Sequence, residues 1–392
     1  MVILLLIFFQ NLLAQVPDFG NRVNMGMIEH DSINEASGLG ASRKNLNVLW
    51  THNDSGDLNR LFAMDIHGKH LGIYQVGSVQ ARDWEDIAIG PGPEEDTDYL
   101  YIGDTGDNSA SHSLYYIYRI VEPDVESNQA PKDSIIAEEN IETIIYKYPD
   151  GPRDAEAVMV DPVSKDIYII SKSDSTANVY LAQYPQPIGE ISTLEYVITL
   201  NIPYIVAADI SISGEEILLK TYTNIFYWRR DPTGIMRQVL LTAPATVPYS
   251  IEPQGESVCW AGDNSGYFTV SEELFGIQAS VYFYPRANNT TIMRMPSKPE
   301  SFILKQNYPN PFNRSTVISY YLEKPGYVQI IIYDELGRLV NSLNRTVSNI
   351  GNHIEIWDGR DKNGISSPNG IYYYMLKSTN KISRLRSMVL LK

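Results

Sequence analysis

Acidic side chains recur in this sequence where short apolar runs begin. Arg82-Asp83-x-Glu85 and Arg153-Asp154-x-Glu156 each precede an alternating apolar stretch, and a proline follows six residues after each glutamate. Three looser copies of the pattern carry an acid at the matching place, namely Glu35, Asp209 and Glu256. Carboxylate oxygens are the ligands that Ca²⁺ prefers in proteins. The repeated acids therefore predict a shared cation site, provided that the repeats converge in space.

The spacing of these acids predicts how they converge. The five anchors stand at positions 35, 85, 156, 209 and 256, which are 50, 71, 53 and 47 residues apart. That period suits a four-stranded propeller blade. Further short β-type runs follow each anchor, with 236–241 as the expected fourth strand of the fourth blade, and a spare run near 23–28 could complete the last blade. We predict an all-β chain in which residues 20–287 form a β-propeller. Five blades are favoured, a sixth would have to lie in the 71-residue interval, and a two-sheet sandwich is the alternative.

A propeller would bring the acids to one mouth of its channel. The first strand of a blade lines the channel and the second runs back, so the start of one and the end of the other share a face. The predicted metal ligands are the acids at these places, Glu35, Asp54, Glu85, Asp104, Glu156, Asp209, Glu256 and Glu272. Zinc is not expected, because the chain has one cysteine and six histidines. The alternative is that the acids only cap turns.

Basic residues accompany the acids at the same mouth. The predicted ligand-binding residues are Arg82, Arg153, Lys172 and Lys220. Arginine can hold a carboxylate or phosphate at two points, so a bound anionic small molecule or glycan is the expected partner. The alternative is that these residues form structural ion pairs with neighbouring acids. No catalytic residue is fixed by the sequence, and the candidates are Glu85, Glu156, Lys172 and Lys220.

Several propeller motifs have a counterpart in a known family. Asp154-Ala155-Glu156, Gln254-Gly255-Glu256, the run 167–172 and the run 267–272 are similar to segments of calcium-dependent β-propeller phytases and esterase-like phytases. The resemblance implies carboxylates that bind calcium and activate water, and basic residues that hold phosphate. It therefore implies a calcium-dependent hydrolase of phosphoric or carboxylic esters. Those phytases have six blades, so the predicted count of five departs from the family.

The C-terminal region has a different character. After a polar linker at 288–301, short β-type runs at 316–322, 327–334, 353–357 and 370–377 predict a small immunoglobulin-like β-sandwich. The motifs NYPNPFN (307–313), YDELGR (333–338), WDG (357–359), the turn 361–364, GIYYY (370–374) and the tail MVLLK (388–392) resemble the type A C-terminal sorting domain of the type IX secretion system. The resemblance spans 302–392 and implies the type IX machinery as a partner and delivery outside the cell. A stalk without a sorting role is the alternative.

The N-terminus and the composition indicate the cellular compartment and limit the classes of partner. An apolar run from Val2 to Phe9 is too short to span a bilayer, so residues 1–15 are predicted to be a signal peptide. The alternative is a buried first strand or helix. No later segment is apolar enough to be a transmembrane segment, and the single Cys259 excludes an intrachain disulfide. The chain has 31 Lys and Arg against 47 Asp and Glu, and this net charge of −16 argues against nucleic acid as a partner.

These observations lead to one functional hypothesis and two alternatives. We expect a secreted or surface-attached calcium-binding β-propeller that binds an anionic ligand at the channel mouth. The first alternative is a metal-dependent ester hydrolase that uses the same residues. The second is a structural surface protein in which the carboxylates only close turns.

Overall fold

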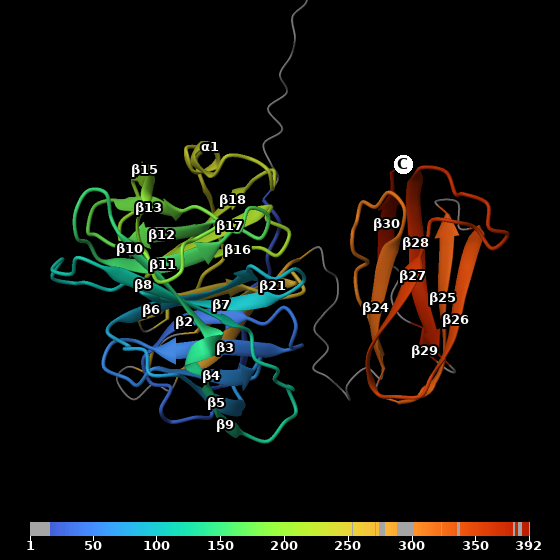
Figure 1. The fold of residues 1–392 in the computed structure, drawn as a ribbon, viewed down its shortest axis with the longest axis horizontal. Coiled ribbons are helices and arrows are strands. Elements are labelled where there is room, and N and C mark those ends of the chain that lie inside the picture. The colour runs from blue at the N-terminus through green and yellow to red at the C-terminus, as the bar shows by residue number, and fades with distance from the viewer. Residues whose placement is uncertain are drawn as a thin grey trace, which may run out of the picture. The chain divides into compact units, whose positions relative to one another are not determined.

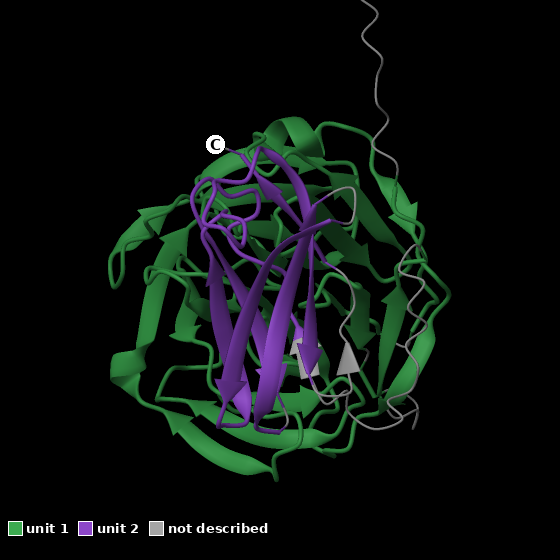
Figure 2. Cartoon of the chain, turned by 90° about the vertical axis from the view of Figure 1, so that its right-hand side faces the viewer, with its two compact units in different colours: residues 1–290 green, residues 291–392 purple. Residues whose placement is uncertain are grey.

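The computed structural model divides into two compact units, residues 1–290 and 291–392 (Figures 1 and 2). It describes residues 16–252, 254–270, 272–273, 279–287, 302–322, 324–334, 338–378, 381–382 and 386–391. The division falls within the expected linker 288–301, which itself lies outside the described residues. The predicted signal peptide, 1–15, also lies outside them and stays a prediction.

The first unit is a β-propeller of five blades, which confirms the predicted fold class. The strands of blades 1 and 2, from the centre outward, are β2 (Ala36–Ala41), β3 (Val48–Asn53), β4 (Arg60–Asp65) and β5 (His70–Val76), then β6 (Trp84–Pro91), β7 (Asp98–Asp104), β8 (Tyr115–Val121) and β10 (Ile141–Lys147). Those of blades 3 and 4 are β11 (Ala155–Val160), β12 (Ile167–Ser171), β13 (Ala177–Ala182) and β15 (Glu195–Leu200), then β16 (Ile205–Ile210), β17 (Glu216–Thr221), β18 (Ile225–Arg229) and β19 (Ala245–Val247). Blade 5 contains β20 (Ser257–Trp260), β21 (Gly266–Val270), β22 (Ser280–Pro285) and β1 (Val23–Met27).

The ring closes through both the inner and the outer strands. Inner strands contact one another in the cyclic order β2, β6, β11, β16 and β20, and β20 returns to β2. Figure 2 shows the sheets of this unit arranged as a ring. The spare N-terminal run becomes β1, which pairs antiparallel with β22 and completes the fifth blade. This pairing covers the outer edge of β22, which would otherwise be an unpaired strand edge.

The blades are held together by apolar side chains between their sheets. The inner and second strands are buried along nearly their whole length. Their runs are therefore almost continuously apolar, as expected for sheets covered on both faces. One core cluster joins Met159 and Ile170 of blade 3 to Ile210 and Leu219 of blade 4. Burying a side chain of this size contributes about 1.5–3 kcal/mol, so these interfaces fix the order of the blades.

The structure differs from the expected strand pattern in three places. The 71-residue interval holds no sixth blade: β9 (Lys132–Ile136) adds to blade 1 in parallel with β5, and the 3₁₀ turn η1 (Glu138–Asn140) follows it. Similarly, β14 (Ile191–Thr193) adds to blade 2 in parallel with β10. The run 236–241, which we expected to be the fourth strand of blade 4, is instead helix α1 (Met236–Leu240).

The second unit is the expected small β-sandwich. One sheet contains β23 (Phe302–Leu304), β24 (Thr316–Leu322) and β27 (Gly351–Trp357). The other contains β25 (Gly326–Asp334), β26 (Leu339–Val347), β28 (Gly370–Ser378), β29 (Lys381–Ile382) and β30 (Arg386–Leu390). Side chains of both sheets, such as Tyr320, Ile330, Trp357 and Tyr374, form one buried cluster. This core lies entirely within the second unit.

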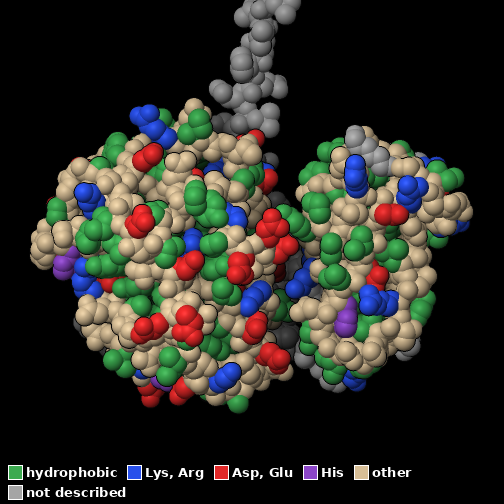
Figure 3. All heavy atoms as spheres, in the orientation of Figure 1, with side chains coloured by type: hydrophobic (Ala, Val, Ile, Leu, Met, Phe, Trp, Pro, Cys, Tyr) green, Lys and Arg blue, Asp and Glu red, His purple; other side chains and the backbone are tan. Residues whose placement is uncertain are grey.

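No helix among the described residues is long and apolar enough to cross a membrane. On the face of the first unit that Figure 3 shows, acidic side chains are spread over the surface with basic side chains between them.

Candidate cation-binding site

A backbone irregularity near the start of several inner strands sets the direction of one side chain in each. In blade 2, register jumps from Trp84↔Asp104 to Asp86↔Gly103, so Glu85 is an extra residue in a β-bulge. The same bulge makes Glu156 the extra residue of blade 3 and Val206 the extra residue of blade 4. A bulge re-aims the side chain at that point of the strand. Because these bulges occur at the starts of inner strands, Glu85 and Glu156 point to the same mouth of the ring.

The ends of the second strands bring further groups to this mouth. Asp54 follows β3, Lys172 follows β12, and Glu272 lies two residues beyond the end of β21. Glu256 directly precedes the inner strand β20. The antiparallel pairing within each blade therefore places acids from blades 1, 2, 3 and 5 at one end of the ring.

Seven carboxylates form three overlapping groups at this mouth. In each group, one oxygen from every member lies within 4.8 Å of the others; the groups are Asp54–Asp83–Glu85, Asp54–Glu256–Glu272 and Glu85–Asp154–Glu156. Asp54 and Glu85 each belong to two groups, so the three groups form one continuous cluster. The predicted ligands that the structure brings together are Asp54, Glu85, Glu156, Glu256 and Glu272.

The cluster is electrostatically unfavourable when every carboxylate is charged. Burial, followed by the neighbouring charges of Asp54, Asp154 and Asp104, raises the pKa of Asp83 to about 6. Burial and the adjacent Glu256 raise the pKa of Glu272 to about 8. Burial, followed by the charge of Glu156, raises the pKa of Glu85 well above its usual range. Desolvation and like-charge repulsion both disfavour the ionised form, and a bound cation would relieve both.

Glu85 lies at the centre of the cluster without a compensating partner. Glu85 is only 4% exposed, and its carboxylate makes no hydrogen bond or ion pair with any residue that the structure describes. Gly106 is next to it, where a Cβ would overlap the carboxylates of both Glu85 and Asp83. A buried carboxylate is normally paired or bound to a metal. Glu85 is therefore the clearest indication that the cluster accommodates a cation.

Lys172 is the basic residue that joins the cluster directly. Its ammonium group forms an ion pair with Glu156, whose residue is 4% exposed. Burial raises the pKa of Glu156, although the Lys172 charge opposes that rise. The neighbouring Tyr222 hydroxyl donates to Glu256 at 2.8 Å. Tyr222 directly follows β17, as Asp54 follows β3 and Lys172 follows β12, so blade 4 contributes an aromatic side chain at this position.

The two predicted arginines lie beside the cluster and pair elsewhere. Arg82 is 3.8 Å from the carboxylate of Asp104, and its guanidinium lies over the ring of Tyr116 at 5.5 Å. Arg153 pairs with Asp150 at 2.8 Å and lies over Tyr180 at 5.0 Å. The expected structural ion pairs therefore exist, but with acids other than the adjacent Asp83, Glu85, Asp154 and Glu156.

Two predicted metal ligands are close to the mouth but outside the three groups. Asp104 is buried and accepts the backbone N–H of Asp83 at 2.9 Å, in addition to its pairing with Arg82. Glu35 is exposed, and by register the residue equivalent to Glu85 in blade 1 is Ser37. Asp104 therefore fixes the loop that carries Asp83, which is the turn-capping role that we kept as the alternative.

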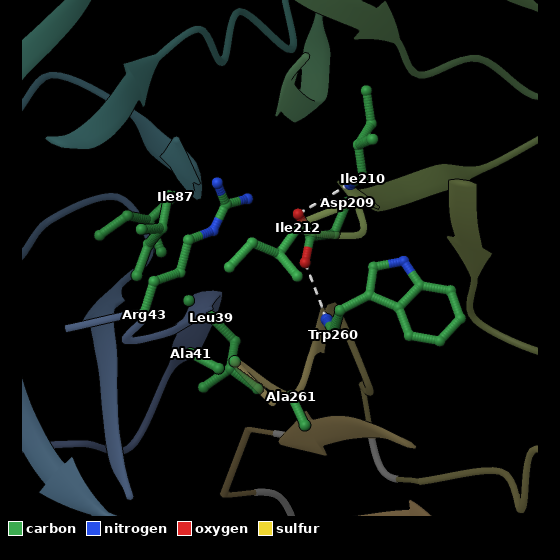
Figure 4. Close-up of a pocket in the computed structure, with 12 residues that line it drawn as sticks. Leu39, Ala41, Arg43, Ile87, Asp209, Ile210, Ile212, Trp260 and Ala261 are labelled. Carbon is green, nitrogen blue, oxygen red and sulfur yellow. Dashed lines mark hydrogen bonds between the residues drawn. The ribbon is translucent and has the colours of Figure 1, made fainter. Parts of the chain in front are cut away.

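Asp209 lies toward the other end of its strand. It pairs with Leu218 near the end of β16, whereas the blade 4 equivalent of Glu85 is Val206. Figure 4 shows its carboxylate accepting the backbone N–H groups of Ile210 at 2.8 Å and Trp260 at 2.8 Å. Burial raises its pKa to about 6, and the Arg43 charge opposes that rise. The structure therefore does not bring Asp209 together with the other predicted ligands.

Lys220 is buried beneath the mouth and has no access to it through solvent. Its ammonium group donates to the carbonyl of Thr221 at 3.2 Å and to the carbonyl of Gly255. It also lies 4.5 Å from the ring centre of Tyr249. Burial lowers the pKa of Lys220 to about 8, although the nearby Glu252 and Glu256 oppose that change. Its contacts are those of a residue that supports the loop before Glu256.

Three residues of the site were not among the predicted ligands. Asp83 and Asp154 stand two residues before Glu85 and Glu156, so the repeated Arg-Asp-x-Glu pattern already contained their signal. Tyr222 had no such signal, because its role depends on its position relative to Glu256.

The donor set of the cluster fits a hard cation. All seven acids of the cluster offer carboxylate oxygens, and Ca²⁺ takes six to eight oxygen ligands in flexible geometry. Histidine and cysteine, which zinc prefers, do not take part in the described groups. The arrangement can therefore hold calcium and present its remaining coordination positions to an oxygen-bearing ligand.

In the second unit, the motifs at the two ends of the domain are bound to each other. The Asn310 side chain accepts the backbone N–H of Val389 at 2.7 Å, and Phe312 exchanges backbone hydrogen bonds with Val389 and Leu391. The Phe312 ring packs on Trp357, with ring centres 5.6 Å apart. The sequence motifs 307–313, 357–359 and 388–391 thus meet in one core.

Comparison with known proteins identifies the class of the second unit. A family model described as FlgD Ig-like domain matches residues 313–381. PorZ, described as an essential bacterial surface component of the type-IX secretion system of Porphyromonas gingivalis, aligns at 13% identity over 93% of this chain and 47% of that chain, with a TM-score of 0.32. FlgD from Xanthomonas campestris aligns at 24% identity over 23% of this chain and 64% of that chain, with a TM-score of 0.18.

A propeller-sized region aligns with another solved structure. Kuenenia stuttgartiensis hydrazine synthase aligns at 11% identity over 64% of this chain and 96% of that chain, with a TM-score of 0.34. No curated protein matches the chain. The chain spans about half the length of PorZ and less than two thirds of FlgD. The protein combines a five-bladed β-propeller, shown by its own sheets, with an immunoglobulin-like domain that matches the FlgD Ig-like family model over residues 313–381. The sorting role and the phytase resemblance stay predictions.

Proposed function

We propose that this protein is an exported β-propeller that binds Ca²⁺ at the mouth of its channel and uses the bound ion to hold an anionic small molecule or glycan. The observation that carries the proposal is the set of three overlapping carboxylate groups. Glu85 belongs to two of them and is buried without a partner among the described residues. A cation at this place would supply the missing compensation.

A binding role agrees better with the basic residues than hydrolysis does. In the hydrolase alternative, the basic residues Arg82, Arg153, Lys172 and Lys220 would hold a phosphate. The two arginines form ion pairs with Asp104 and Asp150. Lys172 is paired with Glu156, and Lys220 donates to two backbone carbonyls beneath the mouth. Neither ammonium group is free to hold a substrate without losing these contacts. The anion would instead bind to calcium at coordination positions that the carboxylates leave open.

The proposed export route depends on the C-terminal unit. Its motifs resemble the type IX sorting domain, and those motifs meet in one core through Asn310, Phe312 and Trp357. The family match to an immunoglobulin-like domain supports the fold but leaves the sorting role as our proposal.

The calcium site can be tested by thermal unfolding of the wild type and the variant Glu85→Gln. In EDTA, Glu85→Gln should melt at a higher temperature than the wild type, because it removes a buried charge that has no partner. Added calcium should raise the melting temperature of the wild type and raise that of Glu85→Gln much less. The matched control is Glu35→Gln, which changes an exposed acid outside the groups and should behave as the wild type. No calcium effect on the wild type would overturn the proposal.

The export route can be tested by deleting residues 302–392 in a bacterium that has a type IX system. The deleted protein should accumulate in the periplasm, while the full chain should be found outside the cell. Normal export of the deleted protein would show that this unit has no sorting role.

A further inference from the structure

The three carboxylate groups of the mouth are not equivalent, because a member of one group is already paired with a lysine side chain. Within Glu85–Asp154–Glu156, the Lys172 ammonium is paired with Glu156. The two groups that share Asp54 contain no Lys or Arg side chain, and none of their members forms an ion pair with a described residue. This difference decides where further positive charge is needed.

We propose that the mouth has two calcium subsites that share Asp54, one completed by Asp83 and Glu85 and the other by Glu256 and Glu272, and that Lys172 takes the place of a third ion. The inference rests on the proposed function and adds the number and position of the ions. Each subsite offers three carboxylates, which leaves coordination positions for water or for oxygens of the ligand.

The burial of the acids supports this assignment independently of their clustering. Glu85, Glu256 and Glu272 are 4%, 7% and 7% exposed. Glu85 has no hydrogen-bond partner among the described residues although it faces Asp83 across Gly106. Leaving a buried carboxylate uncompensated is costly, and the usual remedies are an ion pair or a metal. Glu156 has the first remedy in Lys172, and Glu256 accepts a hydrogen bond from the Tyr222 hydroxyl, but no ion pair compensates the described acids of the two groups that share Asp54. A bound metal would supply that compensation.

The Lys172 ammonium and a calcium ion should exclude each other at Glu156. A Lys172 ammonium that pairs with this carboxylate occupies the space and supplies the charge that an ion in Glu85–Asp154–Glu156 would supply. Removing that ammonium should therefore create a third subsite from residues that are already in place.

The test is to count calcium ions per chain by equilibrium dialysis in the full-length protein. The wild type should bind two ions, and Lys172→Met should bind three. Glu272→Gln should bind one ion, because its subsite loses a carboxylate. The matched control is Lys165→Met: Lys165 lies on the opposite end of the same hairpin, where its ammonium donates to the Gly92 carbonyl at 2.7 Å, and the variant should still bind two.

A double variant protects the test against misfolding. Lys172→Met leaves Glu156 unpaired, whereas Glu156→Gln combined with Lys172→Met removes both charges and should bind two ions. Wild-type binding of one or three ions, or an unchanged count in a folded Lys172→Met, would overturn the inference while leaving the proposed function intact. Absence of any calcium binding by the wild type would instead overturn the proposed function.

Discussion

The carboxylates of the mouth make the stability of this protein depend on pH in an unusual direction. The folded-state pKa is about 6 for Asp83 and about 8 for Glu272, both above the values of free side chains. Between about pH 4 and pH 8 the folded state therefore holds more protons than the unfolded state, and its stability falls as the pH rises. In EDTA, the melting temperature should decrease from pH 5 to pH 8.

Calcium should remove much of that dependence, because it binds the ionised cluster and stabilises it most at the higher pH. Melting curves from pH 5 to pH 8, with EDTA or with calcium, check the expectation. A melting temperature that rises with pH in EDTA would contradict the raised pKa values at this site.

At the residue level, the sequence predicted most of the cluster but chose the wrong anchor residue in two blades, Glu35 in blade 1 and Asp209 in blade 4. Asp209 lies about one blade length along the chain from the anchors Glu156 and Glu256, so the spacing alone indicated it as the anchor of blade 4. The true equivalent, Val206, has no acid to mark it, and only the register of β16 against β17 identifies it. Spacing along the chain fixes which blade a residue belongs to, whereas the bulge that aims a side chain is a property of the folded ladder.

At the level of elements, β1 connects the last blade to the first. It pairs with β22 of blade 5, and the Met25 carbonyl is 3.0 Å from the ring nitrogen Nδ1 of His67, in the β4–β5 turn of blade 1. At Gly26, φ is +154°, and a Cβ there would overlap the His67 carbonyl. Gly26→Ala should therefore weaken the closure of the ring.

We expect Gly26→Ala to lower the free energy of unfolding by about 1–3 kcal/mol, the range for a strained backbone position. Urea unfolding followed by tryptophan fluorescence measures the change. Asn24→Ala, on the same strand and without a glycine-specific conformation, serves as the control and should cost less. Equal effects of the two changes would show that the contact at Gly26 is not critical for closure.

The strands were predicted more reliably than the short helix, for a physical reason. Strands such as β12 and β17 contain short apolar runs, 167–170 and 217–219, a pattern that buried strands share. The run 236–241 is apolar at 236 and at 239–241, but a run this short fits a strand and a helix equally well. Met236 and Leu240 are four residues apart, and both are buried on one side of α1. Both side chains pack against residues of blades 3 and 4, and this packing favours the helix over a strand.

At the scale of the whole molecule, the sequence indicated two units through a change of motif, and the buried cores agree with that division. The propeller clusters use described residues up to 284, and the sandwich cluster uses residues 304–390. Closure of the ring through β1 was also predictable, because one blade lacked a strand and one run was spare. The exchange of β9 and β14 between blades was not predictable, since a parallel strand added at an outer edge leaves no distinct pattern.

Separate cores predict that the two units unfold separately, and the position of the carboxylate cluster predicts which one calcium affects. All seven acids belong to the first unit. Calcium at about 100 times its dissociation constant would add about 2.7 kcal/mol per site to the stability of that unit. For a unit of this size, that corresponds to a rise of about 5–10 °C in its melting temperature for each occupied site.

Differential scanning calorimetry of the full chain should therefore show two transitions, of which calcium moves one. The isolated unit 302–392 identifies the other transition, which should stay at the same temperature in calcium and in EDTA. Magnesium is the matched ion, and it should have a smaller effect because it is reluctant to lose its water ligands. A shift of both transitions would place calcium-binding groups in the second unit as well, and a single shared transition would mean that the two cores unfold as one.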